Sequence, residues 1–304
     1  MPPLFIRSFA LAFILFASPA AQAWNAAGHR LSAVIAWQGM SPASRSFVSQ
    51  ALREHPDHAR WLEKSGDGDA MLVFAEATTW PDSIRRDTRF DGATATLPGF
   101  PDMDRHSDWH YADFDHRGKR GRGQIDRQIA ELAKILRSTA EISEIAWAIP
   151  WLAHLVADIH QPLHVGYSED RGGNEVLVEN PFAARQPFVK LHTYWDDLPG
   201  PSGLRGKRLR LRAEALLAGQ ARPVQGNVAR WLQESRQLLP AAYPATRGSV
   251  TLLIDEAWRD QARAIADRRI AEAGQRLGKL LEDIQRHRVS RETRPAPASI
   301  SPAR

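Results

Sequence analysis

The 304-residue sequence contains no cysteine. This absence excludes disulfide bonds, thiolate ligands for zinc and a cysteine nucleophile, so a bound metal would rely on histidine, carboxylate and backbone groups. Internal repeats and an obvious interior linker are also lacking, which favours one domain. The chain is 43% hydrophobic and 25% charged, as in ordinary globular proteins. Its formal net charge of +5 favours a polyanionic partner such as nucleic acid, although a basic surface that maintains solubility would explain it equally well.

The N-terminal segment has the layout of a cleavable signal peptide. Arg7 precedes an apolar run over residues 9–16, and small residues lead to an A-x-A site at 21–23. The run is too short to span a membrane. We therefore expect residues 1–23 to be removed and the protein to be periplasmic or secreted, with no stable membrane anchor. Trp24 would become the first residue, and its free α-amine could serve as a neutral nitrogen ligand near His29.

Helical spacing dominates the remaining chain and predicts an all-α fold. Residues 91–104 and 117–123 are expected to be loops, and the one strand signal, 175–179, opens a short β-hairpin near 173–190. Pro150 either kinks its helix or starts a second one. We predict a single multi-helix domain over residues 24–289 and a disordered tail over 290–304. The expected helices cover residues 28–38, 42–52, 71–84 with a break at Pro81, 125–136, 142–159, 204–217, 228–239 and 249–288.

Potential metal ligands concentrate in residues 154–164. His154 and Asp158 are four residues apart, so on a helix they project from one face and can chelate one ion. Pro162 ends that helix and can turn His164 back towards the same region. Three further clusters pair a histidine or an arginine with an acid: His192 with Asp196, His110 with Asp113, and Arg85 with Asp82.

An isolated histidine–aspartate pair is more often a surface hydrogen bond than a metal site. His154 and Asp158, however, lie in a very apolar helix, where a buried carboxylate needs a cation or hydrogen-bond donors. Together with the other clusters, this favours a metal site, and zinc among the catalytic metals. His160 points off the ligand face. The other histidines, His55, His58, His106, His116 and His287, lie in polar segments and are expected to be exposed.

These motifs resemble the zinc-dependent, single-strand-specific nucleases and 3′-nucleotidases typified by mung bean nuclease. The elements W-x4-H, D-x-x-R, H-x-x-D, H-x3-D-x-H-Q-P-L-H, G-G-N and H-x3-D occur in the family's order between Trp24 and Asp196. The resemblance implies a helical fold of the phospholipase C/nuclease type, acting as a monomer with three zinc ions. The implied ligands are Asp82, His110, His154 and Asp158 for the first ion; His164, His192 and Asp196 for the second; and the amine and carbonyl of Trp24 with His29 and Asp158 for the third.

The resemblance also implies roles around the metals. Asp113 would orient or deprotonate the attacking water, Arg85 would bind the scissile phosphate, and Tyr111 would stack on a base. The implied substrates are single-stranded DNA and RNA, cleaved to 5′-phosphates, and 3′-nucleotides. Asn174 belongs to the G-G-N motif and is expected near the substrate.

The chain departs from the family in three ways. It lacks the disulfides of the fungal members. Lys119 is the best candidate for a phosphate-binding lysine whose place cannot be fixed from the sequence. Asp197 stands where some members present an amide to the base.

Two other functions remain possible from the sequence. Zinc-dependent phospholipases C share the fold and the N-terminal tryptophan, but they usually place the first histidine further along and end the ligand set with glutamate. A secreted basic protein that binds nucleic acid and contains a structural zinc is the second alternative. Asp113 and Arg85, which lie beside the ligands without belonging to them, argue against it.

Overall fold

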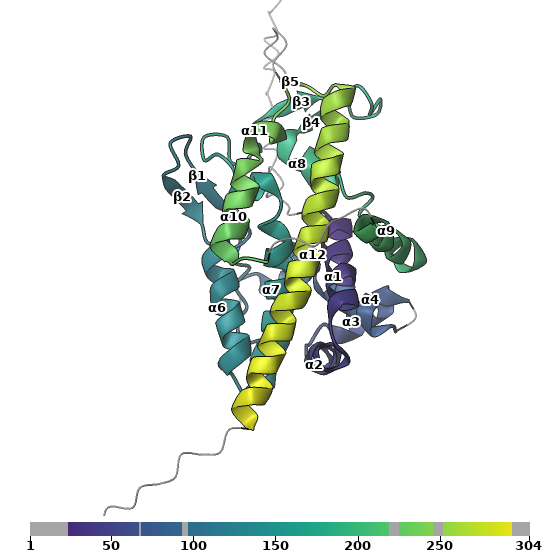
Figure 1. Ribbon diagram of the computed structural model, residues 1–304, viewed down its shortest axis with the longest axis vertical. Coiled ribbons are helices and arrows are strands. Elements are labelled where there is room, and N and C mark those ends of the chain that lie inside the picture. The colour runs from purple at the N-terminus through teal and green to yellow at the C-terminus, as the bar shows by residue number, and fades with distance from the viewer. Residues whose placement is uncertain (1–23, 67, 93–96, 219–224, 246–251, 294–304) are drawn as a thin grey trace, which may run out of the picture.

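The computed structural model describes residues 24–66, 68–92, 97–218, 225–245 and 252–293. The predicted leader (1–23) and residues 294–304 of the predicted tail lie outside these ranges. Helices dominate (Figure 1), so the all-α prediction is confirmed. The α-helices are α1 (Ala26–Gly39), α2 (Pro42–Arg53), α3 (His58–Ser65), α4 (Ala70–Ala77), α5 (Trp80–Ser83), α6 (Ile125–Ser138), α7 (Ile142–Asp158), α8 (Leu191–Asp197), α9 (Gly206–Ala218), α10 (Val228–Gln237), α11 (Leu239–Ala242) and α12 (Glu256–Glu292). Three short 3-10 helices are η1 (Ile84–Arg86), η2 (Thr88–Phe90) and η3 (Pro162–Val165).

Local signals explain where several helices begin and end. The Ser41 side chain accepts a hydrogen bond from the Ser44 amide, and Pro42 occupies the first turn of α2, as the sequence indicated. The Asp255 side chain accepts from the Trp258 amide and starts α12. Helix α12 therefore begins later than the predicted residue 249. It also continues to residue 292, so the predicted tail starts too early.

Helix α12 runs along the molecule and packs on α1 and α7 (Figure 1). A Cβ atom on Gly274 would lie 2.6 Å from the Cβ of Ile35, so the close approach of α12 to α1 requires glycine here. Helix α7 is almost entirely buried and passes through Pro150 as a single helix, which excludes the alternative that a second helix starts there. The core is rich in fully buried tryptophans, which are Trp24, Trp80, Trp151 and Trp195.

The strands in the described part of the chain form two small sheets. Strand β3 (Leu177–Glu179) pairs antiparallel with β4 (Phe188–Lys190), which confirms the hairpin predicted near 173–190, and β5 (Leu252–Leu253) joins β3 in parallel. A second hairpin, β1 (Ala112–Phe114) with β2 (Arg120–Gly123), was not predicted. The loop prediction for 117–123 is thus wrong in part. The Arg-Gly-Arg-Gly sequence of β2 has no apolar alternation, and the strand depends on pairing with β1.

Within the described ranges, no helix is both long and apolar enough to cross a bilayer.

Candidate metal centre

Every predicted side-chain ligand comes to one region of the fold. His154 and Asp158 lie on the last turns of α7, and His164 lies on η3 just beyond them. Within the described residues, three groups of side chains have ligand atoms within 4.8 Å of one another. The groups are His29, His154 and Asp158; Asp82, His110 and His154; and His164, His192 and Asp196.

The group of Asp82, His110 and His154 has a spacing that suits a metal ion. His154 Nε2 lies 3.0 Å from His110 Nδ1 and 3.2 Å from Asp158 Oδ2. Asp82 Oδ1 completes the group at 3.8 Å from His154 Nε2. Ligand atoms around a tetrahedral zinc ion with bonds of about 2.1 Å lie about 3.4 Å apart, which agrees with these separations.

The group of His164, His192 and Asp196 combines η3 with α8. His164 Nε2 lies 3.2 Å from His192 Nε2, and Asp196 Oδ2 lies 3.6 Å from the same His192 nitrogen. Because His192 and Asp196 are four residues apart on α8, the helix itself sets their separation.

Asp158 also faces a third histidine. Its Oδ1 atom lies 3.4 Å from His29 Nε2, whereas Oδ2 faces His110 and His154. Trp24 is fully buried nearby, and its indole Nε1 donates to the carbonyl oxygen of Ala157 at 3.1 Å.

The histidines of α7, η3 and α8 are held by backbone carbonyls. The Nδ1–H groups of His154, His164 and His192 donate to the carbonyl oxygens of Thr78 (2.8 Å), His110 (2.6 Å) and Gly172 (2.6 Å). These bonds leave each Nε2 lone pair facing the cluster, the arrangement typical of metal-binding histidines. Gly172 has φ +62, and a Cβ there would lie 2.3 Å from the Leu163 carbonyl oxygen, so this position requires glycine.

The chemistry of the cluster favours a cation. Burial lowers the pKa of His29, His110 and His164 well below the usual value, which keeps them neutral, as metal ligands must be. Burial raises the pKa of Asp158 to about 6 and that of Asp196 well above its usual value. Several buried polar atoms have no hydrogen-bond partner in the structure, including His29 Nε2, Asp82 Oδ1 and Asp158 Oδ1. A cation would satisfy them.

A cleft of about 650 Å³ opens onto this cluster and contains four of the predicted functional residues. Arg85, Tyr111, Asp113 and Asn174 line it together with the predicted ligands His110, His164 and His192. Arg85 Nε lies 3.4 Å from Oδ1 of Asp82, which is a predicted ligand. Burial raises the pKa of Asp113 to about 6, although Arg171 and Arg122 lower it.

Two predicted substrate contacts lie outside this lining. Lys119 is exposed in the turn between β1 and β2, and Asp197 is exposed on α8, where its carboxylate accepts from Asn25 Nδ2 at 3.0 Å. The cleft instead carries Arg122 from β2 and Arg171 from the loop after η3, neither of which was predicted. Both depend on tertiary contacts that leave no pattern in the sequence.

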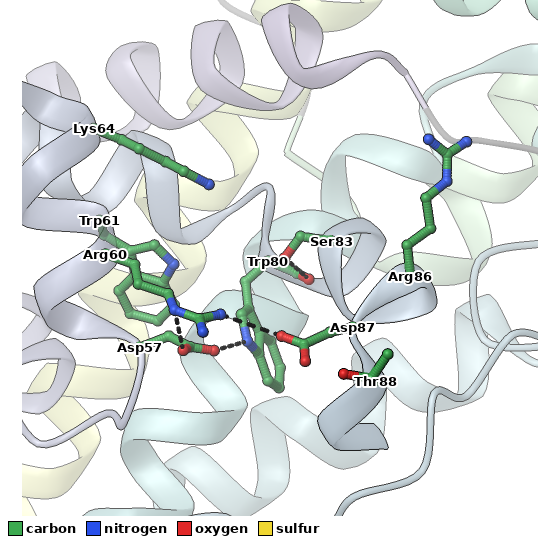
Figure 2. A pocket seen from close by; sticks show the side chains of 9 residues that line it. All are labelled: Asp57, Arg60, Trp61, Lys64, Trp80, Ser83, Arg86, Asp87 and Thr88. Carbon is green, nitrogen blue, oxygen red and sulfur yellow. Dashed lines mark hydrogen bonds and ion pairs between the residues drawn. The ribbon is translucent and has the colours of Figure 1, made fainter. Parts of the chain in front are cut away.

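A second cavity, of about 370 Å³, is lined by residues that include Trp61 of α3, Trp80 of α5 and Arg86 of η1 (Figure 2). Trp80 donates to Asp57 at 2.8 Å, and Arg60 lies between Asp57 and Asp87. None of the predicted functional residues lines it.

His55 corrects the expectation that it would be exposed. It is buried, with ring centroids 4.4 Å from Trp61 and 4.8 Å from Trp80. Burial lowers its pKa to about 3, so it packs as a neutral aromatic ring. His160 is also fully buried and points away from the ligands, with Nε2 2.9 Å from Arg276 Nη1.

Comparison with known proteins agrees with this geometry. Endonuclease 4 of Arabidopsis thaliana is 29% identical over 248 residues, which cover 73% of this chain and 79% of that protein. Endonuclease 2 of the same plant is 26% identical over 60% of this chain and 58% of its own length. Endonuclease 1 is 28% identical over 54% of this chain and 50% of its own length. The family described as S1/P1 Nuclease matches residues 24–286. The chain therefore belongs to the S1/P1 nuclease family and is a hydrolytic nuclease.

Proposed function

We propose that this nuclease uses three zinc ions to hydrolyse phosphodiester bonds of single-stranded DNA and RNA, leaving 5′-phosphates, and that it also removes the phosphate of 3′-nucleotides. The observation that carries the proposal is the environment of Asp158. This carboxylate is fully buried, and its two oxygens face different imidazoles. A buried carboxylate in such surroundings is stabilised when each oxygen binds a cation.

The residues suit zinc in number and kind. Asp82, His110, His154 and Asp158 would hold one ion, and His164, His192 and Asp196 a second. His29, Asp158 and the amine and carbonyl of Trp24 would hold a third. Nitrogen and carboxylate ligands without thiolate are typical of catalytic zinc. Bound zinc would supply an activated water and stabilise negative charge on phosphate oxygens.

Asp113 and Arg85 would act on the attacking water and on the scissile phosphate, respectively. Asp113 lines the cleft without belonging to any of the three ligand groups, so its carboxylate is left to orient the attacking water and accept its proton. The Arg85 guanidinium at the metal end can bind two oxygens of the scissile phosphate and stabilise the charge that develops on them.

The lining of the cleft supports a preference for single strands. Tyr111 is half-buried in the cleft wall and can stack on a base, which must be free of a duplex to reach it. Asn174 also lines the cleft, and its side-chain amide donates to the Arg171 carbonyl oxygen at 2.9 Å. It would line the path of the strand. Stacking accepts all bases, so little sequence preference is expected.

Secretion or periplasmic export belongs to the same proposal. The composition of residues 1–23 supports a cleaved leader. Removal of the leader would also produce the free amine at Trp24 on which the third zinc site depends. We expect the exported enzyme to act as a monomer.

Two assays separate this proposal from its alternatives. The protein starting at Trp24 is incubated with single-stranded DNA or RNA, and in parallel with phosphatidylcholine, and its zinc content is measured. Hydrolysis of the nucleic acids alone supports the proposal. Release of phosphocholine would indicate a phospholipase C, and binding of nucleic acid without hydrolysis would indicate a protein with structural zinc.

A further inference from the structure

The lining of the cleft includes two arginines that the proposed chemistry does not use. Arg122 projects from β2 and Arg171 from the loop between η3 and β3, and both line the cavity that contains His110 and His164. We call Arg122 and Arg171 the arginine pair. Both residues are exposed, so a ligand in the cleft can reach their guanidinium groups.

The backbone holds Arg171 in an uncommon conformation. Its φ is 55°, a left-handed value that few residues other than glycine adopt. The surrounding loop is fixed by hydrogen bonds: the Gly172 amide donates to Tyr167 O at 2.9 Å, and Asn174 Nδ2 donates to Arg171 O at 2.9 Å. An ordered loop that keeps a charged residue in a strained conformation beside a cleft indicates that its placement matters for function.

Internal carboxylates do not satisfy the arginine pair. The ion-pair contact of Arg171 is a long one, 4.0 Å to Glu175 Oε1, with an Arg171 side chain that is 69% exposed. Among the described residues, no acid lies within ion-pair distance of Arg122. The neighbouring Asp170 is already engaged, because it accepts from the Tyr243 hydroxyl at 2.7 Å and from the Gly173 amide at 2.9 Å. The guanidinium donors are therefore available to an anion, and phosphate is the anion that their planar geometry binds best.

The arginine pair is separate from Arg85, the arginine beside the predicted metal ligands. Arg85 contacts the ligand carboxylate of Asp82, and its charge lowers the pKa of His110 and His164. The charges of Arg122 and Arg171 instead act on Asp113 and Tyr111. A strand whose scissile phosphate lies at Arg85 and the metals would thus pass a neighbouring phosphate along the wall with Arg122 and Arg171.

We propose that the arginine pair binds a phosphate group that flanks the scissile one and thereby selects polynucleotides over substrates with a single phosphate. The proposal rests on the proposed hydrolysis of single strands, because it assigns a second contact to the same substrate.

The test compares the Arg122→Gln/Arg171→Gln double variant with a charge-matched control, Lys64→Gln/Arg86→Gln. The control removes two positive charges from the second cavity, where Figure 2 shows the Lys64 and Arg86 side chains. Each protein is assayed for kcat and KM on a ten-nucleotide thymidine strand and on the dinucleoside monophosphate, which has one phosphodiester and no flanking phosphate. Binding of the labelled ten-nucleotide strand is measured by fluorescence anisotropy at several salt concentrations, in an Asp113→Asn background that slows cleavage.

For the double variant we expect KM for the ten-nucleotide strand to rise about tenfold. The slope of the logarithm of the binding constant against the logarithm of the salt concentration should become less steep by about 0.7 for each phosphate that the protein no longer neutralises. The assays are run at pH 8, well above the Asp113 pKa of about 6, so that Asp113 stays deprotonated when the two positive charges that lower its pKa are removed. Under these conditions the kinetics on the dinucleoside monophosphate should stay unchanged, and the control should match the parent on both substrates. Equal losses on both substrates would overturn the proposal, because the arginine pair would then act on the scissile phosphate. Unchanged binding of the longer strand would overturn it as well. A third outcome would separate the two proposals. If the double variant binds the ten-nucleotide strand more weakly than the parent, but the parent hydrolyses neither substrate, the proposed function fails and the phosphate site stands.

Discussion

Asp158 Oδ1 lies 3.4 Å from His29 Nε2, and this contact joins the N-terminal helix to the end of α7. The second oxygen of the same carboxylate lies 3.1 Å from His110 Nδ1 and 3.2 Å from His154 Nε2. Asp158 is fully buried, so its charge must be balanced within this cluster. One carboxylate therefore connects two potential metal positions.

Substitution of Asp158 should affect more than one ion. We expect Asp158→Asn to abolish hydrolysis and to lower the zinc content by more than one ion per chain, because both carboxylate oxygens lose their charge. Asp196→Asn is the matched control. Asp196 belongs to one ligand group, so its substitution should lower the zinc content by one ion per chain. Zinc content is measured by mass spectrometry of the metal after dialysis. A full complement in Asp158→Asn would disprove the bridging role.

Asp113 should matter for turnover and little for metal binding. We expect Asp113→Asn to keep its zinc while kcat falls on the order of a hundredfold or more, the usual scale for loss of a general base. Metal analysis and steady-state kinetics on the same preparation check this. Loss of zinc together with activity would place Asp113 among the ligands.

The same carboxylate predicts a pH dependence. Burial raises the pKa of Asp113 to about 6. A base must be deprotonated to accept a proton, so kcat/KM should fall about tenfold for each pH unit below 6 and level off above it. Zinc content is followed over the same range, because protonation of the ligands would also release metal. The account is contradicted if the parent and Asp113→Asn show the same acid limb while zinc stays bound.

The N-terminus should be part of the third metal position. An amide nitrogen has its lone pair delocalised into the carbonyl and is a poor ligand, whereas a free amine at Trp24 can coordinate. A chain that begins at Ala23 should therefore bind one zinc weakly and lose activity relative to one that begins at Trp24. Equal zinc content and equal rates in the two chains would show that the Trp24 amine has no role.

The sequence predicted those features that depend on local geometry. The pairs His154 and Asp158, and His192 and Asp196, are set by one turn of helix, and the structure brings both pairs into the cluster. The hairpin near 173–190 and most helices follow from periodicity in the same way. For these features, the spacing of residues close together in the sequence was enough to predict the structure.

Features set by tertiary contacts could not be predicted. Strand β2 is formed by pairing with β1, and that pairing places Arg122 in the cleft. Arg171 reaches the cleft through a left-handed backbone conformation that its residue type does not indicate. His55 is buried by aromatic rings from α3 and α5, although its local sequence is polar.

A count of zinc ions in the active protein tests the central claim most directly. Native mass spectrometry of the chain beginning at Trp24 is combined with an assay on single-stranded DNA before and after removal of metal with a chelator. We predict three zinc ions per chain, loss of hydrolysis on their removal, and recovery when zinc is returned. An active protein that contains no zinc, or only one ion, would contradict the account.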